Sequence, residues 1–339
     1  MKLSVDEAFR LSERALIAAG YNEAEATRIT EHIVDTELRG LDYGGLARTL
    51  SIFERTTKPD YKRGSIEVVY ETPLSALVDG RNTIGYLVAR HASDLCIKKA
   101  SEHGMAVVGA RDTWHTGMLS FFAEMAAERD LVSMIASNAA PNTAPFGGTE
   151  GRFGTNPICF GFPSADAPVI WDIGTSNIMH GEAILAERLG EALPEGVAYD
   201  ANGIATTDPT AALAGAFTAW GGHKGSGLAI AVQLLGTMCN VAPIPKGMFG
   251  YGCLFVMIRC DLLMPAEEYK RKVTDYANEV RKTRPVKRGT AVRMPYDRSR
   301  AERQRRLDMD EVEIPDEVHD RLLRIVHSNE PAGNQPIGT

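Results

Sequence analysis

The stretch that decides the fold combines glycine-rich loops with two short apolar segments. It reads Pro145-Phe-Gly-Gly-Thr-Glu-Gly-Arg-Phe-Gly-Thr-Asn-Pro-Ile-Cys-Phe-Gly-Phe-Pro163 and, after residues 164–167, Pro168-Val-Ile-Trp-Asp-Ile-Gly-Thr-Ser176. Its glycines indicate backbone that bends sharply or lies close against a neighbour. Residues 158–162 and 169–173 have the length of buried strands, and polar residues follow each of them. Polar groups at strand ends are well placed to hold a ligand, although glycine-rich turns between two strands are the alternative.

Length and composition indicate a globular protein that handles small molecules. The 339 residues are enough for one large or two ordinary cores, and the 44% hydrophobic and 24% charged content is typical of soluble proteins. The net charge of −7 favours neither nucleic acid nor an anionic membrane as a partner. Five scattered cysteines without a Cys-x-x-Cys pair suggest neither disulfides nor a zinc site. The polar N-terminus and the absence of a long apolar run make the cytoplasm the expected location.

The N-terminal part of the chain has the pattern of a helical unit. Ser4-x-x-Glu7 and Asn22-x-x-Glu25 are typical capping boxes, and each precedes apolar residues at helical spacing. The C-terminal part contains charged amphipathic patterns over residues 265–283 and 316–327, followed by a tail from Ser328 that we expect to be mobile. We therefore predict a helical domain formed by residues 1–65 and 265–339.

The middle of the chain alternates strand and helix patterns. Strands are expected at residues 66–70, 75–79, 105–109, 131–136, 158–162, 169–173 and 249–260. Helices are expected at residues 89–103, 121–129, 209–217 and 225–239, and the last of these is so apolar that it should be buried in a core or a subunit interface. The fold class is therefore α+β, or mixed α/β, with residues 66–264 forming a second domain around a mixed sheet.

Several common catalytic and nucleotide-binding motifs are missing from the sequence. There is no Gly-x-Gly-x-x-Gly between a strand and a helix, so the usual Rossmann fingerprint is absent. The sequence also lacks a Walker loop, a Gly-x-Ser-x-Gly elbow and a His-Glu-x-x-His pair. These absences argue against the common NTPases, hydrolases and metalloproteases.

Three other segments contain residue types suited to binding or proton transfer. Gly221-Gly-His-Lys-Gly-Ser-Gly-Leu228 leads into the apolar helix, so free N–H groups and Lys224 could face a phosphate; a tight turn with a surface lysine is the alternative. Asp172, Thr175 and Ser176 follow a predicted strand, where the carboxylate could accept hydrogen bonds from ribose hydroxyls. His115 follows another predicted strand and could exchange a proton near neutral pH, or be purely structural.

The strings Gly154-Thr-Asn-Pro157 and Asp172-Ile-Gly-Thr-Ser176 resemble the signature of the malate/L-lactate dehydrogenase-like oxidoreductases. This family is distinct from the Rossmann-fold lactate and malate dehydrogenases, and the resemblance covers nearly the whole chain. It implies a non-Rossmann NAD(P)-binding domain, NAD or NADP as cofactor, a small carboxylate substrate and a homodimer. It further implies a substrate contact by Thr155 and cofactor contacts by the following residues: Asn156, Asp172, Gly174, Thr175, Ser176, His223, Lys224 and Gly225.

The chain departs from the family pattern where a proton donor is expected. The family's Leu-Arg-Gly-x-Asp-Ser-His-Gly-x-x-Arg appears here with Tyr43 and Gly44 in place of the Ser-His pair. Arg48 keeps its place, and a guanidinium suits a substrate carboxylate because it can donate two parallel hydrogen bonds. Three hypotheses account for the change: Tyr43 donates the proton, His115 does so alone, or the substrate needs little help. A cyclic ketimine fits the third, since hydride addition to a protonated imine gives a neutral amine.

A second departure lies near the C-terminus. Relatives commonly have Pro-Gly-Glu where this chain has Pro295-Tyr-Asp297, which puts one expected cofactor contact in doubt. The arginines that follow are expected to form a solvated or subunit-contact face, or else a 2′-phosphate pocket: Arg298, Arg300, Arg303, Arg305 and Arg306. With two family motifs altered, a catalytically silent paralogue that binds a dinucleotide or metabolite is the alternative to an oxidoreductase.

Overall fold

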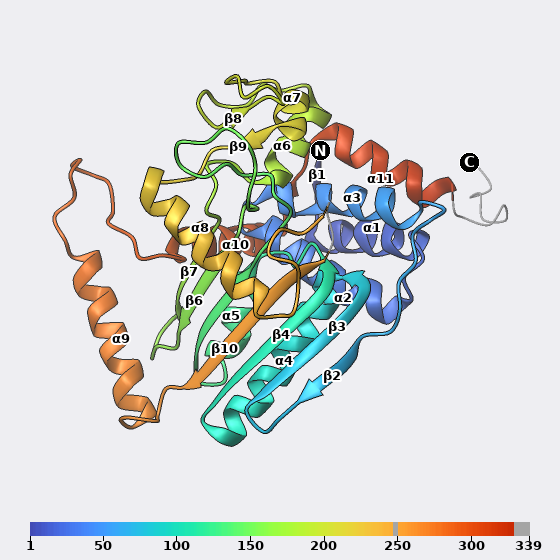
Figure 1. The fold of residues 1–339 in the computed structure, drawn as a ribbon. Coiled ribbons are helices and arrows are strands. Elements are labelled where there is room, and N and C mark those ends of the chain that lie inside the picture. Colours follow the sequence, from blue (N-terminus) through green and yellow to red (C-terminus); the bar gives the residue numbers. More distant parts are fainter. Residues whose placement is uncertain (247–249, 329–339) are drawn as a thin grey trace, which may run out of the picture. The chain divides into compact units, whose positions relative to one another are not determined.

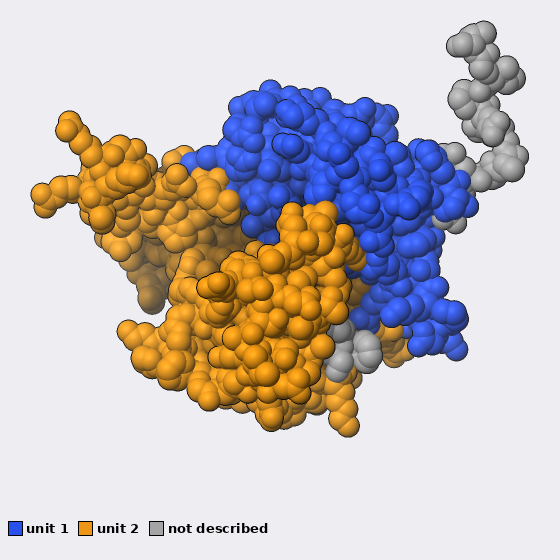
Figure 2. Space-filling model, turned by 90° about the horizontal axis from the view of Figure 1, so that it is seen from above, with its two compact units in different colours: residues 1–62, 299–339 blue, residues 63–298 orange. Residues whose placement is uncertain are grey.

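A computed structural model describes residues 1–246 and 250–328, so the expected mobile tail beyond Ser328 and the expected strand start at Phe249 lie outside the described residues. The chain divides into two compact units, which Figure 2 colours separately. Unit 1 contains Met1–Lys62 and the chain from Ser299 onward, and unit 2 contains Arg63–Arg298.

Unit 1 is built mainly from helices contributed by both ends of the chain (Figure 1). The two predicted capping boxes are confirmed: Ser4 Oγ accepts from Glu7 N at 3.1 Å, and Asn22 Oδ1 accepts from Glu25 N at 3.0 Å. The short strands of this unit pair antiparallel. Its elements are β1 (Lys2–Leu3), α1 (Val5–Ala18), α2 (Glu23–Leu38), the 3₁₀ turn η1 (Asp42–Gly44), α3 (Leu46–Thr56), most of α10 (Asp297–Met309), β11 (Val312–Glu313) and α11 (Asp316–Ser328).

Unit 2 contains a seven-stranded mixed sheet in the order β2-β3-β4-β10-β5-β6-β7 (Figure 1). Only β3 and β4 run parallel; the other neighbouring pairs are antiparallel. The mixed α/β class is thereby confirmed, since a doubly wound Rossmann sheet is mostly parallel. The strands are β2 (Glu67–Glu71), β3 (Ser75–Ile84), β4 (Met105–Trp114), β5 (Leu131–Ser137), β6 (Ile158–Phe162), β7 (Val169–Ile173) and β10 (Tyr251–Arg259).

Helices cover both faces of this sheet. Because side chains alternate along a strand, Ile135 and Cys159 face the core formed with α4 (Gly85–His103) and α5 (Leu119–Ala127). Their neighbours Ala136 and Ile158 face the other way, toward Val232 of α8 (Gly222–Thr237). A smaller lobe has a core of its own and contains α6 (His180–Leu189), β8 (Ala198–Tyr199), α7 (Pro209–Ala214) and β9 (Ala216–Phe217). Across residues 1–246 and 250–328, every helix is too short or too polar to cross a bilayer.

Several elements differ from the sequence-based expectations: the helix expected over residues 209–217 ends at Ala214 and strand β9 follows it, and three further differences bear on the arrangement of the units. Strands β3 and β4 continue about five residues further than expected, because Thr83 still pairs with Thr113 and Ile84 with Trp114. Helix α9 (Ala266–Arg281) belongs to unit 2, whereas we had expected residues 265–298 in the helical domain. It is tied there by Thr274 Oγ1, which accepts from Ala165 N at 3.0 Å.

Helix α8 is the third difference, since one of its sides is exposed in the single chain. Ile230, Leu234 and Met238 are 47%, 61% and 67% exposed, and their spacing places them on the same side of the helix. The expected burial in a core therefore holds for the side of α8 that faces the sheet and not for this exposed side, where a subunit interface stays a prediction.

One buried side chain fastens α8 to the glycine-rich stretch. The Oδ1 atom of Asn156 accepts from Ala139 N at 3.2 Å and Gly154 N at 3.1 Å. Its Nδ2 donates to Ala229 O at 2.9 Å and Gln233 Oε1 at 2.8 Å, both on α8. Since a primary amide offers two donors and two acceptor sites, all of its hydrogen bonds are made inside the protein.

We expect Asn156→Gly to lower the free energy of unfolding by about 2–4 kcal/mol, because it leaves several buried backbone and side-chain groups unpaired. Glycine also tolerates the φ of 33° at this position, so the loss will report hydrogen bonds and not backbone strain. Chemical denaturation measures this change in the free energy of unfolding. The matched control is Asn177→Gly, which removes an exposed asparagine with two hydrogen bonds and should cost less than about 1 kcal/mol. Equal losses for the two variants would contradict the assignment.

Candidate functional site

Three loops of unit 2 that are distant in sequence meet beside Asn156. Thr175 N donates to Thr155 O at 2.8 Å, and its hydroxyl donates to the same oxygen at 3.1 Å. Trp220 N donates to Thr175 O at 2.9 Å, and Ser176 forms an isolated β-bridge with Ala219. The structure therefore brings together the loops 154–157, 174–177 and 219–226, which the sequence singled out separately. We call these three loops the cradle.

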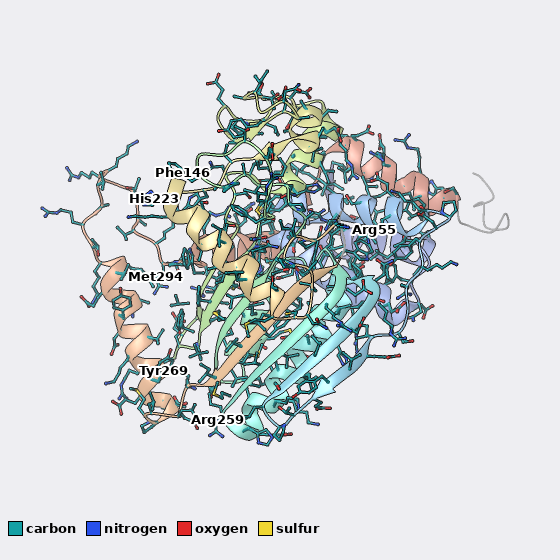
Figure 3. All side chains as sticks on the ribbon, in the orientation of Figure 1. Arg55, Phe146, His223, Arg259, Tyr269 and Met294 are labelled. Carbon is teal, nitrogen blue, oxygen red and sulfur yellow. The ribbon has the colours of Figure 1, made fainter. Side chains whose placement is uncertain are left out.

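The third loop of the cradle ends in the exposed start of α8. Gly221 and Gly222 have φ values of 65° and 60°, which favour glycine, and Gly221 precedes the helix without a side-chain cap. His223 and Lys224 are exposed there, and Figure 3 shows His223 beside Phe146 at this end of the helix. The two rings lie 6.1 Å apart, and Ser226 Oγ accepts from Phe146 N at 3.0 Å. Uncapped N–H groups next to a lysine suit an anionic ligand such as a phosphate.

Gly225 is fixed by its neighbours, whereas Gly227 is not. A Cβ at Gly225 would collide with the carbonyl oxygen of Trp220, while a Cβ at Gly227 would meet nothing within 4 Å. The tight turn before α8 therefore depends on the absence of a side chain at Gly225. Gly174 is similarly confined, because a Cβ added there would collide with Met179 Sδ, so this glycine also shapes the cradle.

Several cradle residues expected to contact the cofactor have their side chains engaged within the protein. The hydroxyl of Ser176 donates to Ile178 O at 2.7 Å, and that of Thr175 is fully buried. Asp172 Oδ2 accepts from Ser120 N at 2.7 Å, at the start of α5. Desolvation raises the pKa of Asp172, against the opposing effect of the Ser120 hydrogen bonds. These side chains are thus engaged in holding the loops together, and the exposed side chains of the cradle are those of Asn177, Trp220, His223 and Lys224.

His115 lies in unit 2, in the loop between β4 and α5. Its φ is 50°, and its ring packs edge-on against Trp114 with centroids 5.5 Å apart. Trp114 is fully buried and donates from Nε1 to Asn82 O at 3.0 Å. A Cβ at Gly85 would lie 2.8 Å from His115 O, so the first turn of α4 also confines this loop. The half-buried His115 is therefore held by rigid neighbours on both sides.

Tyr43 and Arg48 lie in unit 1, on turn η1 and in the first turn of α3. Both are half-buried. Gly44 is buried, and a Cβ added there would lie 2.9 Å from Thr36 Cγ2 on α2. The methyl group of Thr36 therefore occupies the space next to the position where the family pattern has histidine.

Beside them, Glu37 of α2 is buried and accepts from Leu46 N at 2.8 Å. Sequence reasoning missed this carboxylate, as it missed Ser226 and Gln233, since a single polar residue within a helix carries no distinctive pattern. The only available signal for Glu37 was its position directly before Leu38-Arg-Gly40.

The C-terminal arginines are only partly the solvated face that we expected. Arg303 pairs with Asp35 at 2.6 Å, and Arg306 pairs with Glu302 at 2.8 Å and donates to Glu37 O at 2.7 Å. Arg305 also pairs with Glu302. Hydrogen bonds from these two arginines lower the pKa of Glu302 to about 2. Acidic partners within unit 1 thus engage three of the five arginines.

At the second departure from the family pattern, Tyr296 keeps a backbone conformation suited to glycine. Its φ is 78°, which is uncommon for an aromatic residue. Asp297 accepts two hydrogen bonds from Arg281, at 2.7 and 2.9 Å. Its carboxylate therefore secures the end of the segment that follows α9.

We expect Gly225→Ala to weaken NAD(P)H binding at least about tenfold, because the added methyl group must displace the turn before α8. Fluorescence titration with NADH and NADPH measures this change. Gly227→Ala is the matched control, being two residues away, on the same helix and in open space. It should leave binding unchanged and raise stability slightly, as alanine favours helix by up to about 1 kcal/mol. Unchanged binding in both variants would show that the start of α8 does not hold the cofactor.

Comparison with known proteins gives the same family as the sequence motifs. The family model described as malate/L-lactate dehydrogenase matches residues 3–323. The chain is 32% identical to malate/(S)-sulfolactate dehydrogenase of Methanothermus fervidus, over 96% of this chain and 97% of that one. It is 34% identical to Delta(1)-pyrroline-2-carboxylate reductase of Ancylobacter novellus, over 69% and 70% of the two chains.

A solved structure agrees with these sequence matches. The dehydrogenase from Sinorhizobium meliloti superimposes with a TM-score of 0.89 at 29% identity, covering 96% of this chain and 98% of that one. The chain belongs to the malate/L-lactate dehydrogenase family and is an NAD(P)-dependent oxidoreductase.

Proposed function

We propose that this enzyme transfers hydride between a nicotinamide cofactor and a small 2-imino acid, with cyclic ketimine carboxylates as its preferred substrates. The observation that carries the proposal is Gly44, which places no side chain where the family pattern has a proton-donating histidine. The Thr36 methyl group beside Gly44 leaves little room for one to be added. The 34% identical relative named as a pyrroline-2-carboxylate reductase supports the same substrate class.

The two substrate classes differ in what the protein must supply. When a 2-oxo acid accepts hydride at its carbonyl carbon, the oxygen becomes an alkoxide that must then receive a proton. A protonated ketimine already carries that proton on nitrogen, so hydride addition at carbon converts C=N⁺ to a neutral amine. An active site without a strong proton donor therefore suits the imine better than the ketone.

The residues of the cradle fit a dinucleotide. A bound NAD or NADP supplies the hydride; the uncapped start of α8 and Lys224 would hold its phosphates, and Asn156 and Thr175 keep the surrounding loops in place. We propose that Arg48 binds the substrate carboxylate through two hydrogen bonds, with Thr155 as a second substrate contact. Tyr43 and His115 are the candidate proton donors for substrates that need one.

We expect NAD(P)H-dependent reduction of cyclic ketimine carboxylates with kcat/KM at least about tenfold above that of pyruvate-type 2-oxo acids. Absorbance of the reduced cofactor measures the turnover. His115→Gln and Tyr43→Phe should impair ketone reduction more than imine reduction, since only the ketone needs the proton. Rapid turnover of 2-oxo acids with none of cyclic imines would overturn the substrate assignment. Cofactor binding without turnover of either class would favour the silent paralogue.

We also propose that the protein is a homodimer in which α8 forms part of the interface, because its exposed stripe is apolar. Leu234→Glu should shift the sedimentation coefficient from dimer to monomer, as it places a charge in the centre of that stripe. Glu31→Leu, on the exposed surface of α2, is a control that should leave the dimer intact. An unchanged coefficient for Leu234→Glu would exclude α8 from the interface.

A cytoplasmic location remains our proposal, supported by five cysteines that are all buried and unpaired.

A further inference from the structure

The carboxylate of Asp172 connects the last strand of the sheet to the helix that follows the His115 loop. Its Oδ2 accepts from Ser120 N at 2.7 Å, in the first turn of α5. Met118 precedes α5 and makes no side-chain cap hydrogen bond. Since the first N–H groups of a helix have no partner within the helix, Asp172 supplies an acceptor from 52 residues away. The helix dipole also favours a negative charge at this end.

The alternation of side chains along β7 places this carboxylate against α5. Ile170 is buried in the core that contains α5, whereas Ile173 packs on the other face of the sheet with Val232 of α8. Asp172 is two residues from Ile170, so both side chains lie on the face that α5 covers. Strand β7 therefore has α5 on the side of Asp172 and α8 on the side of Ile173.

The second cradle loop begins directly after β7. Thr175 N and the Thr175 hydroxyl both donate to Thr155 O, at 2.8 and 3.1 Å. The backbone of β7 also pairs with β6 along its whole length. None of these contacts involves the carboxylate of Asp172. We therefore expect the cradle loops to keep their positions when this carboxylate is removed.

His115 lies on the other side of the Asp172 hydrogen bond, five residues before Ser120. The start of its loop is held by Trp114, whose Nε1 donates to Asn82 O at 3.0 Å. The end of the loop is held where Ser120 N donates to Asp172. Asp172 is thus an attachment point between the His115 loop and the strand that leads into the cradle.

We propose that Asp172 is a positioning residue that holds His115 in place beside the cofactor cradle, and that it is not a ligand of the cofactor ribose. The proposal rests on the proposed function, in which the cradle holds the nicotinamide cofactor and His115 can give a proton to a ketone. A proton donor must lie within hydrogen-bond reach of the reacting atom, so a displacement of about 1 Å in its loop is enough to slow the transfer.

The test compares Asp172→Ala and Asp172→Asn with wild type in the full-length protein. Alanine removes the acceptor, while asparagine keeps an oxygen that can accept from Ser120 N without the charge. Asp208→Ala is the matched control. Asp208 Oδ1 accepts from Thr210 N at 3.1 Å at the start of α7, so this variant loses the same kind of helix cap elsewhere in unit 2.

Hydrogen exchange without cofactor is the first readout. In Asp172→Ala, exchange of the peptide 115–124 should accelerate at least about fivefold, because the first turn of α5 loses its cap. Exchange of the cradle loops 174–177 and 219–226 should change less than about twofold. Asp172→Asn should restore most of the protection of the peptide 115–124, and Asp208→Ala should leave that peptide unchanged.

Steady-state kinetics are the second readout, and they separate a role through His115 from general destabilisation. We expect Asp172→Ala to lower kcat for 2-oxo acids at least about tenfold and to leave the Kd of NADH or NADPH within about threefold. Its kcat for cyclic ketimines should also stay within about threefold, since imine reduction needs no proton from His115. Asp172→Asn should recover ketone reduction to within about threefold of wild type.

The readouts distinguish the possible failures. A Kd for NADH or NADPH that rises about tenfold in both Asp172 variants, with exchange of the peptide 115–124 unchanged, would make Asp172 a cofactor ligand and overturn the inference. Equal losses of ketone and imine reduction would overturn it too. A wild-type protein that turns over neither substrate class would refute the proposed function, while exchange would still decide whether Asp172 holds the His115 loop.

A further variant covers the case in which Asp172→Ala does not fold. Asp172→Glu keeps the charge and moves the acceptor by one methylene group, so it should accelerate exchange of the peptide 115–124 and lower ketone reduction in the same direction. Exchange and ketone reduction that both match wild type in Asp172→Glu would contradict the positioning role.

Discussion

The architecture of unit 2 depends on one carboxamide, that of Asn156. It joins the glycine-rich stretch to α8 through four hydrogen bonds made in the buried interior. A buried polar group of this kind lowers the stability of the fold when it is unpaired, and it specifies a single arrangement of its neighbours when it is fully paired. The loop 174–177 then attaches through Thr155, and the start of α8 attaches through Trp220. The uncapped start of α8 is thereby placed on a rigid support, without the glycine fingerprint of a Rossmann domain.

Unit 1 is stabilised differently around the segment that carries Tyr43 and Arg48. There the buried carboxyl group of Glu37 accepts a hydrogen bond from Leu46 N at the start of α3, and desolvation raises its pKa to about 8. Arg306 and Glu302 close this arrangement from the C-terminal end of the chain. The loss of the Ser-His pair is thus accompanied by close packing of Thr36 and Glu37 against Gly44 and Gly45. This packing restricts the conformation of the segment that contains Gly44 and Gly45.

Much of this could be predicted from the sequence, because capping boxes, apolar periodicity and glycine-rich strings are local signals. Ser4, Asn22 and the strands around the glycine-rich stretch are examples. The sequence could not show that the side chains of Asn156 and Thr175 form their hydrogen bonds within the protein, since their partners lie up to 77 residues away. Nor could it show that Arg306 reaches Glu37 across 269 residues, or that α8 leaves one apolar side exposed.

The central claim is that three loops joined through Asn156 hold a nicotinamide dinucleotide. Hydrogen exchange of the full-length protein, followed peptide by peptide with and without saturating NADH or NADPH, tests it most directly. The account predicts that the cofactor slows exchange in the loops 154–157, 174–177 and 219–226 together. Cofactor binding that protects other segments and leaves these three loops unchanged would contradict it.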